Sequence, residues 1–413
     1  MNQKIQPFNY SGEIISNSSK SYFQRVIALI SISKTTCLVH GLYNDDDVKV
    51  ALGIFKAIGG KVKKNTNNIF LDSRDVYPGS NISLSCGESG LSTRMFGTVL
   101  TCIFSIIKLN GDRSIANRKI DFSELSQLGV LVKRVSKRMP IILKGNLSSG
   151  TINVDGSQGS QLISGLLIAL SSLKKDSVIN VKDLVSKPYV LMTIQILKEF
   201  GISIINEDFS KFIIKGDQIP VSRDYFVEGD WSGAAFHLVG AAISGEVSIT
   251  GLNLASLQAD IKILDVLLMC GSKVIKGENS VTVKKGRLES FVFDAQNCPD
   301  LFPPLVVLAS CCIGVTKISG VNRLSNKESN RAVVLQLEFK KLGIEIDIRG
   351  DDMLITGTTH IIGNEVDSNG DHRIAMALAT MASVSNSPIN ILNADVVAKS
   401  YSNYFNDLEK VSN

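Results

Sequence analysis

The chain alternates between apolar stretches of helical length and short runs in which apolar and polar residues take turns. Two of the apolar stretches, Leu162–Leu170 and Phe236–Ser244, contain no charged residue, which is typical of helices that are buried on all sides. Runs such as Ile344-Glu345-Ile346 have the period of a strand with one face in the core. The pattern predicts an α/β protein whose helices are buried and whose sheets surround them.

A helix-like stretch that ends in glycine and leads into a strand-like run recurs five times. The glycines are Gly59, Gly129, Gly201, Gly271 and Gly343, at spacings of 70, 72, 70 and 72 residues. Each suits the position just after a helix, where a positive φ costs glycine least. The repeat predicts successive α/β units of equal length.

A sixth unit would place its glycine beyond the last helix-like stretch, Tyr404–Val411. We therefore expect the two chain ends to meet in one unit, with the extended Ile14-Ile15 supplying the missing strand. Units of this length exceed the ~20–35 residues of leucine-rich or ankyrin repeats. Two pseudo-symmetric domains of three units each fit the chain length better.

The first crossing between these domains should follow residue 17, and the return should lie near Val227–Asp230. This predicts a terminal domain of residues 1–17 plus 229–413 and a central domain of residues 18–228. Ligand sites often form at such junctions. We expect the active site in the cleft between the two domains.

Composition narrows the class of protein. The chain has 413 residues, of which 44% are hydrophobic and 20% charged, as expected of a globular protein with a large core. A net charge of +5 does not require nucleic-acid binding and suits a concave anion site. Seven cysteines without a CxxC pair and only four histidines predict neither zinc nor a disulfide framework. With no secretory signal or membrane span in the sequence, we expect a cytoplasmic protein without membrane contact.

The stretch Asn17–Arg25 combines a polar turn, Lys20, Ser21 and Arg25 before an apolar run. A helix that starts near Ser18 or Ser19 would direct free N–H groups, a hydroxyl and two cations to one place, as an anion site requires. Taken alone, the stretch is more typical of a capped helix on the surface. The same combination recurs before other predicted helices. With Lys20 and Arg25, the cations at such helix starts are Arg94, Arg118, Lys187, Lys327, Arg331, Arg373 and Lys399. Together these cations oppose the helix dipoles and indicate ligands with several negative charges.

In chain order the motifs read SKSxxxR, ESGxxxR, GSQGSQ, SKPY, VEGDWS, PD, KESNR, GDHRIAM and AKSYxxYF. From Ser19 to Phe405 the chain resembles the 5-enolpyruvylshikimate-3-phosphate synthases. The resemblance implies two domains of three βαβαββ units each, an inside-out α/β barrel, joined by two crossings. The glycine period is what such a fold would leave in a sequence.

The resemblance also implies the reaction. The enolpyruvyl group of phosphoenolpyruvate would pass to the 5-hydroxyl of shikimate 3-phosphate, and a tetrahedral intermediate would then expel phosphate, a step of chorismate biosynthesis. Asp300 would be the base on the 5-hydroxyl, and Glu328 and Lys20 would deliver and return protons. Carboxylates and lysines held close together can share such transfers. The substrate-binding residues that the resemblance implies are Lys20, Ser21, Arg25, Gly90, Arg118, Ser160, Gln161, Ser186, Tyr189, Asp300, Lys327, Arg331, Arg373 and Lys399. No cofactor or metal is implied, and we expect a monomer.

Two other functions stay open at this point. The sister enolpyruvyl transferase that acts on UDP-N-acetylglucosamine usually carries a reactive cysteine in a loop, and residues 111–120 contain none. A non-enzymatic protein that binds anions or RNA could use the same cations, although basic residues interleaved with aromatic ones are missing here. The chain departs from the family pattern at Glu88, Lys119, Gly159 and Asn330. These departures leave substrate affinity and the response to glyphosate-like inhibitors open.

Overall fold

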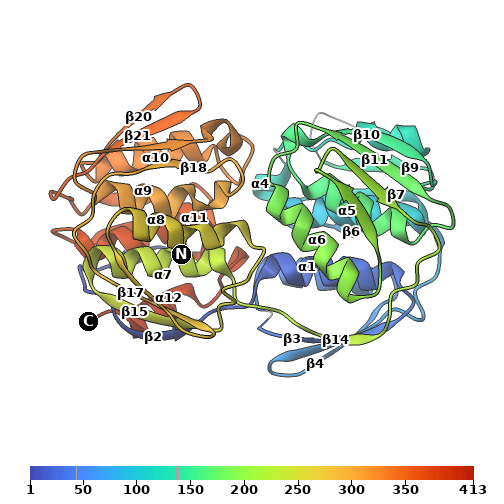
Figure 1. Ribbon diagram of the computed structural model, residues 1–413, viewed down its shortest axis with the longest axis horizontal. Coiled ribbons are helices and arrows are strands. Elements are labelled where there is room, and N and C mark those ends of the chain that lie inside the picture. Colours follow the sequence, from blue (N-terminus) through green and yellow to red (C-terminus); the bar gives the residue numbers. More distant parts are fainter. Residues whose placement is uncertain (43, 117, 135–138) are drawn as a thin grey trace. The chain divides into compact units, whose positions relative to one another are not determined.

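The computed structural model describes residues 1–42, 44–116, 118–134 and 139–413 (Figure 1). Contacts between Cα atoms divide the chain into two compact units. One comprises Met1–Ser18 together with Glu228–Asn413, and the other comprises Ser19–Val227. Within the described residues, no helix is long and apolar enough to cross a membrane.

The unit Ser19–Val227 has helices at its centre and sheets around them (Figure 1). The central helices are α1 (Lys20–Ile32), α3 (Gly90–Val99) and α5 (Gln161–Ser171), and the outer ones include α2 (Asp46–Ala57), the short α4 (Arg113–Ala116) and α6 (Lys187–Glu199). The sheets have the strand orders β14 (Arg223–Phe226), β3 (Thr36–His40), β5 (Asn68–Asp72), β4 (Lys61–Lys64); β6 (Gly79–Ser85), β7 (Phe104–Asn110), β9 (Ile141–Lys144), β8 (Leu131–Arg134); and β10 (Thr151–Asp155), β11 (Ser177–Lys182), β13 (Lys211–Ile214), β12 (Ile204–Glu207).

The unit that holds both chain ends repeats this plan. Its central helices are α7 (Trp231–Ser244), α9 (Phe302–Ser310) and α11 (His372–Met381), and the outer ones are α8 (Ile263–Met269), α10 (Arg331–Lys341) and α12 (Tyr404–Lys410). The sheets have the strand orders β16 (Lys273–Lys276), β17 (Ser280–Lys284), β15 (Glu246–Thr250), β2 (Ser11–Ile15); β18 (Val292–Asp294), β19 (Val315–Ser319), β21 (Asp352–Thr356), β20 (Glu345–Arg349); and β1 (Gln3–Ile5), β23 (Ile389–Leu392), β22 (Glu365–Asp367).

The five four-stranded sheets share one strand pattern and the sheet of β1, β23 and β22 has its first three strands, in agreement with the predicted α/β fold. In the sheet of β6 to β9, β6 is parallel to β7, and β9 is antiparallel to both β7 and β8. The periodic glycines all follow a helix and have φ between 83° and 96°. A side chain is disfavoured in that conformation, which explains why glycine recurs at this one position in each unit.

The prediction for the N-terminal strand was wrong. The strand that completes the last sheet is β1, which is antiparallel to β23. Ile14 and Ile15 belong instead to β2, which is parallel to β15. In the other unit β14 is parallel to β3 in the corresponding place. The chain therefore leaves each unit directly after an edge strand of that unit, β2 or β14. Each of these strands pairs with a strand from a distant part of the sequence.

The central helices pack closely because small residues face their neighbours. Nearly all of α5 is buried, as the apolar stretch Leu162–Leu170 predicted. A Cβ on Gly165 would lie 3.0 Å from Thr98 and 3.2 Å from the backbone of Met95, so glycine lets α3 approach α5. On α7, a Cβ on Gly240 would overlap the ring of Tyr10. These two glycines therefore allow α5 and α7 a close approach to their neighbours.

His237 of α7 is fully buried among aromatic rings, with centroids 5.1 Å from Tyr404, 5.7 Å from Tyr401 and 6.1 Å from Tyr10. Among the residues that the structure describes, neither ring nitrogen has a hydrogen-bond partner. Burial disfavours the imidazolium and lowers the pKa of His237 to about 4, although the charge of Asp407 opposes this shift. The histidine is therefore neutral in the folded protein at pH 7.

We expect His237→Phe to protect the protein from acid. The pKa of His237 is about 4 when folded and ~6.5 when unfolded, so the stability that its neutral form contributes is complete above pH 6.5. That stability is lost as the pH falls from 6.5 to 4, by about 3 kcal/mol. Urea unfolding followed through Trp231, the single tryptophan of the chain, measures this loss.

The matched control is His360→Gln, which changes an exposed histidine of the same unit. It should keep the wild-type dependence of stability on pH, whereas His237→Phe should flatten it. An equally steep loss of stability in His237→Phe would contradict the prediction.

Candidate active site

Arg331 begins α10 and is 1% exposed, and it binds three carboxylates at once. Its Nε lies 2.7 Å from Asp371 Oδ2, its Nη1 lies 2.7 Å from Asp300 Oδ1, and its Nη2 lies 2.7 Å from Glu328 Oε2. Burial alone would lower the pKa of Arg331, but the three carboxylates outweigh it and raise the pKa above its usual value. One guanidinium thus fixes the relative positions of Asp300, Glu328 and Asp371.

Asp300 lies in the single turn Pro299–Leu301 that precedes α9. Besides Arg331, its carboxylate accepts hydrogen bonds from Arg373 Nη2 at 3.1 Å and from Lys327 Nζ at 3.4 Å. Burial alone would raise the pKa of Asp300, but Arg373, Lys327 and Arg331 hold it well below its usual range. Burial lowers the pKa of Lys327 despite the nearby carboxylates. In this state Asp300 is ionised and can accept a proton or a hydroxyl hydrogen bond.

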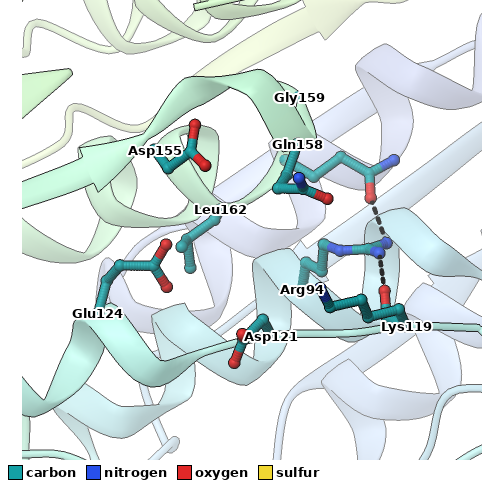
Figure 2. Close-up of a pocket in the computed structure, with 9 residues that line it drawn as sticks. Arg94, Lys119, Asp121, Glu124, Asp155, Gln158, Gly159 and Leu162 are labelled. Atoms are coloured by element: carbon teal, nitrogen blue, oxygen red, sulfur yellow. Dashed lines mark hydrogen bonds between the residues drawn. The ribbon is translucent and has the colours of Figure 1, made fainter. Parts of the chain in front are cut away.

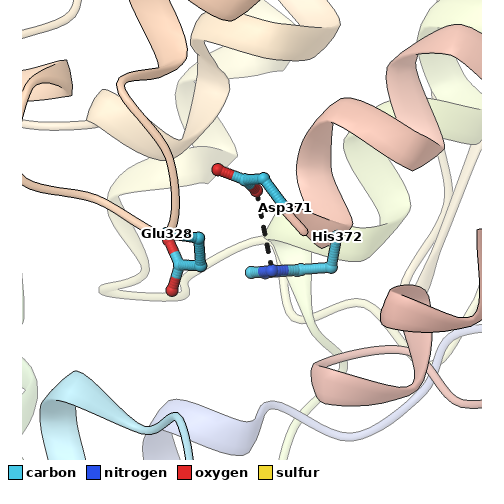
Figure 3. A group of neighbouring side chains, drawn as sticks. All are labelled: Glu328, Asp371 and His372. Carbon is cyan, nitrogen blue, oxygen red and sulfur yellow. Dashed lines mark ion pairs between the residues drawn. The ribbon is translucent and has the colours of Figure 1, made fainter. Parts of the chain in front are cut away.

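Glu328 has a cation on each carboxylate oxygen, because Lys399 Nζ lies 3.5 Å from Oε1 and Arg331 holds Oε2. Figure 3 shows Glu328 beside Asp371 and His372, whose ring Nδ1 lies 3.7 Å from Asp371 Oδ1. These three side chains could in principle hold a metal ion. However, both carboxylates already pair with Arg331, and Asp371 also caps α11 by accepting from the Arg373 N–H at 3.0 Å. The Arg331 guanidinium therefore supplies the positive charge that balances Glu328 and Asp371.

Arg373 lies on α11, and its guanidinium is buried. Its Nη2 binds Asp300, whereas no hydrogen-bond partner of its Nη1 is found among the described residues. A buried N–H group without an acceptor costs about 1–3 kcal/mol. An anionic ligand that accepts from Nη1 would remove this cost, which makes Arg373 a natural contact for a carboxylate or a phosphate.

In the unit Ser19–Val227, Lys20 opens α1 and Ser19 is its N-cap, as predicted. The ammonium of Lys20 lies 2.9 Å from Asp47 Oδ2 at the start of α2, and both side chains are mostly buried. One turn further along α1, Gln24 Nε2 donates to Ser89 Oγ and Ser92 Oγ, each at 2.9 Å. These contacts link the start of α1 to the starts of α2 and α3.

Arg25 is 1% exposed, and its partners among the described residues are neutral oxygens. Its Nε donates to Thr193 Oγ1 at 2.9 Å, its Nη1 to the Ser21 carbonyl at 2.9 Å and its Nη2 to the Tyr189 carbonyl at 3.3 Å. Burial lowers the pKa of Arg25 to about 10, so it is still charged at neutral pH. A buried cation surrounded by dipoles gains much from an incoming anion.

Arg94 connects three of the predicted site segments. Its Nη1 donates to Gln161 Oε1 at 2.9 Å and its Nη2 to the Lys119 carbonyl at 3.0 Å. A Cβ on Gly90 would lie 2.8 Å from Arg118 Nη1 and 3.3 Å from Arg94 Nη1, so a side chain there would press on the ends of both arginines. A pocket of about 150 Å³ lies here, lined by Arg94, Lys119, Asp121, Glu124, Asp155, Gln158, Gly159, Gln161 and Leu162. Figure 2 shows Arg94 beside Lys119 at this pocket.

Two of the departures from the family pattern have local explanations. Gly159 has φ 117° and ψ −178°, a conformation that side chains rarely adopt, so glycine fits this backbone. Glu88 accepts from Ser114 Oγ at 2.8 Å and lies 3.8 Å from Arg113 Nη1, which offsets its charge beside Gly90. Asn117, in the predicted loop 111–120, lies outside the described residues.

The predicted residues fall into local groups. Asp300, Lys327, Glu328, Arg331, Arg373 and Lys399 form one network of ion pairs. Ser21, Arg25 and Tyr189 form a second group, and Gly90, Arg118 and Gln161 meet around Arg94. Ser160 and Ser186 are the buried N-cap residues of α5 and α6.

Two residues that bind site side chains directly, Asp371 and Asp47, are not among the predicted site residues. Asp371 stands in the GDHRIAM motif and could have been found there. Asp47 is one of three consecutive aspartates, Asp45 to Asp47, and nothing in the sequence distinguishes it from its neighbours.

Comparisons with known proteins agree with this architecture and these motifs. The family described as EPSP synthase (3-phosphoshikimate 1-carboxyvinyltransferase) matches residues 5–408. Curated proteins named 3-phosphoshikimate 1-carboxyvinyltransferase are similar along the whole chain. The one from Clostridium novyi is 32% identical over 99% of this chain and 97% of its own length. The one from Clostridium acetobutylicum is 34% identical over 99% of this chain and 96% of its own length.

Solved structures show the same fold. The EPSP synthase of Acinetobacter baumannii superposes with a TM-score of 0.82 at 22% identity, over 100% of this chain and 98% of that one. The enolpyruvyl transferase NikO from Streptomyces tendae reaches a TM-score of 0.78 at 16% identity, over 99% and 97% of the two chains. The family match over nearly all of its length and the relatives above 30% identity establish that the chain belongs to the EPSP synthase family.

Proposed function

We propose that this protein transfers the enolpyruvyl group of phosphoenolpyruvate to the 5-hydroxyl of shikimate 3-phosphate and releases phosphate, a step of chorismate biosynthesis. Family membership and the full-length relatives named 3-phosphoshikimate 1-carboxyvinyltransferase support this reaction. The structural observation that carries it is the buried network around Asp300, Glu328 and Arg331, in which carboxyl groups are held next to several cations.

The reaction needs one proton to leave the 5-hydroxyl and one to reach the methylene carbon. Asp300 is the proposed base. In the ligand-free network its pKa is low because Arg373, Lys327 and Arg331 surround it. When substrate anions draw some of these cations away, the pKa of Asp300 should rise, and the carboxylate becomes a better proton acceptor. Glu328, with Lys399 3.5 Å away, is the proposed proton donor to the methylene carbon.

The remaining cations are proposed to hold the two anionic substrates. Lys20, Arg118, Arg331, Arg373 and Lys399 are assigned to phosphoenolpyruvate, whereas Ser21 and Arg25 are assigned to the carboxylate of shikimate 3-phosphate. The residues assigned to its phosphate and ring hydroxyls are Ser160, Gln161, Ser186, Tyr189, Asp300 and Lys327. The orphan nitrogen of Arg373 and the buried charge of Arg25 support these assignments, because both groups gain most from an anion.

Asp47→Asn should lower kcat/KM for phosphoenolpyruvate by about tenfold or more, which corresponds to ~1.4 kcal/mol. The Asp47 carboxylate holds the ammonium of Lys20 at 2.9 Å, and Asn keeps the size of the side chain but removes the charge. Steady-state kinetics measure the loss. Asp46→Asn is the matched control, because Asp46 is in the same helical turn and pairs with Lys49 at the surface. Equal kinetic constants for the two variants would contradict the role of Asp47.

Phosphate release separates the candidate functions. The protein is incubated with phosphoenolpyruvate and either shikimate 3-phosphate or UDP-N-acetylglucosamine, and a coupled assay follows phosphate. Release with shikimate 3-phosphate alone supports the proposal. Release with the UDP-sugar would favour the sister transferase, and release with neither acceptor would leave an anion-binding protein without this activity.

A further inference from the structure

Asp260 is a fully buried carboxylate to which the reaction proposed above gives no role. It lies in the single turn Ala259–Lys262 before α8. The hydroxyl of Ser232, in the first turn of α7, donates to its Oδ2. Its Oδ1 is buried and has no hydrogen-bond partner among the described residues. Half of this carboxylate is therefore unsatisfied inside the protein.

The charges that face Asp260 come from three other segments. Asp230 caps α7, Asp300 precedes α9, and Arg373 lies on α11. Burial and then the charge of Asp300 raise the pKa of Asp260 to about 6, with a further contribution from Asp230, whereas Arg373 and the Ser232 hydroxyl oppose the rise. Lys262, on the same turn as Asp260, pairs with Asp265 at 2.7 Å, at the surface.

Cys298 also lies near Asp260. Burial and the charges of Asp260, Asp294 and Asp300 raise the pKa of its thiol well above the usual value, so it stays neutral. Of these two groups, Asp260 is therefore the one that can change its charge close to neutral pH.

Arg373 and Asp260 thus carry opposite charges, act on each other electrostatically, and each have one polar atom without a hydrogen bond to the described residues. Within the described part of the chain, Arg373 Nη1 is a donor without an acceptor, and Asp260 Oδ1 is an acceptor without a donor. Asp300 shares the same arginine through Nη2 at 3.1 Å. In the empty site the negative charge of Asp260 helps to balance Arg373. An anion that binds Arg373 takes over this balance and repels Asp260, which favours the protonated form of the carboxyl group.

We propose that Asp260 is a positioning residue that supplies a counter-charge for Arg373 in the empty site and takes up one proton from solvent when an anionic ligand binds there. The proton adds to Oδ1, the oxygen that lacks a partner, and it returns to solvent when the anion leaves. This inference rests on the proposed function only in taking Arg373 as a ligand contact. It adds a proton-linked control of anion affinity to that site.

Sulfate is a suitable probe because it carries two negative charges and does not titrate between pH 5 and 8. The protein is first saturated with shikimate 3-phosphate, and sulfate is then titrated calorimetrically in two buffers with different ionisation enthalpies. The wild type should take up a fraction of a proton per sulfate bound, and this fraction should grow as the pH falls from 8 towards 6. Sulfate affinity should rise over the same interval.

Three variants make the test specific. Asp260→Asn should abolish the proton uptake and lower the KM for phosphoenolpyruvate about three- to tenfold at pH 7.5, because a buried negative charge no longer opposes the anion. Ser232→Ala keeps the carboxylate but removes a hydrogen bond that lowers its pKa, so it should move the uptake to higher pH. Asp265→Asn, on the exposed face of the following helix, should behave like the wild type.

Unchanged proton uptake in Asp260→Asn would overturn the proposal, and so would a shift to lower pH in Ser232→Ala. The Ser232→Ala result keeps the test decisive if Asp260→Asn does not fold. Failure of the proposed function has a different signature, because the wild type would then release no phosphate from phosphoenolpyruvate with shikimate 3-phosphate.

Discussion

Glu328→Gln and Asp300→Ala are each expected to lower kcat by about 10²–10⁴-fold, the usual contribution of a general acid or base. Glutamine has the shape of Glu328 and can still accept from Arg331, which lies 2.7 Å away, but it cannot donate and recover a proton as a carboxyl group does. Removal of the Asp300 carboxylate takes away the group proposed to accept the hydroxyl proton. KM values should change by less than about tenfold, because neither substitution removes a cation that binds the substrates.

Steady-state kinetics with both substrates, together with single-turnover measurements, separate binding from chemistry. Glu338→Gln is a matched control, because Glu338 is a buried glutamate of α10 that pairs with Lys341 at 2.7 Å outside the network. It should keep near-wild-type turnover. If Glu328→Gln and Asp300→Ala both did the same, the assignment of acid and base would be wrong.

The repeated α/β units and their buried helices could be predicted from the sequence, because backbone conformation and burial restrict which residues can occur there. The five glycines recur because each unit places a left-handed residue between a helix and a strand, and that constraint is visible without any knowledge of the partners in space. Buried helices such as α5 and α7 were likewise evident, since a helix without charges has no face for solvent.

Strand partners and counter-ions were harder to predict. Gln3–Ile5 and Ile14-Ile15 are both short and extended, and only the sheets decide that β1 pairs with β23 whereas β2 pairs with β15. Asp47 and Asp260 belong to the site region because the fold brings them to Lys20 and to Arg373, respectively. No local pattern marks either residue, because the partner of a buried charge is set by packing rather than by sequence spacing.

Arg331→Met should destabilise the unit that holds both chain ends by about 3–5 kcal/mol at pH 7.5, the cost of leaving buried charges without their partner. Arg331 is the guanidinium shared by Asp300, Glu328 and Asp371, and Asp371 is completely buried. Methionine fills much of the volume, so the loss should come from the uncompensated carboxylates rather than from a cavity. Urea unfolding followed by the fluorescence of Trp231, which lies in the same unit, measures the difference in unfolding free energy.

The dependence on pH identifies the cause. In the wild type the pKa of Asp300 is held well below its usual range, so its contribution is complete above the unfolded pKa of ~3.9 and is lost as the pH falls further. Without Arg331 the carboxylates should have higher pKa values and take up protons in mild acid, which relieves their repulsion. The difference between Arg331→Met and wild type should therefore shrink from pH 7.5 to pH 5.

Two further variants separate the buried network from ordinary ion pairing. Arg331→Met combined with Asp371→Asn should recover part of the lost stability, because one of the stranded charges is gone. Arg349→Met breaks an exposed pair with Asp347, at 2.7 Å, and should cost no more than about 1 kcal/mol. A loss in Arg331→Met as small as that in Arg349→Met, or one that grows in acid, would mean that the carboxylates do not depend on Arg331 for their charge.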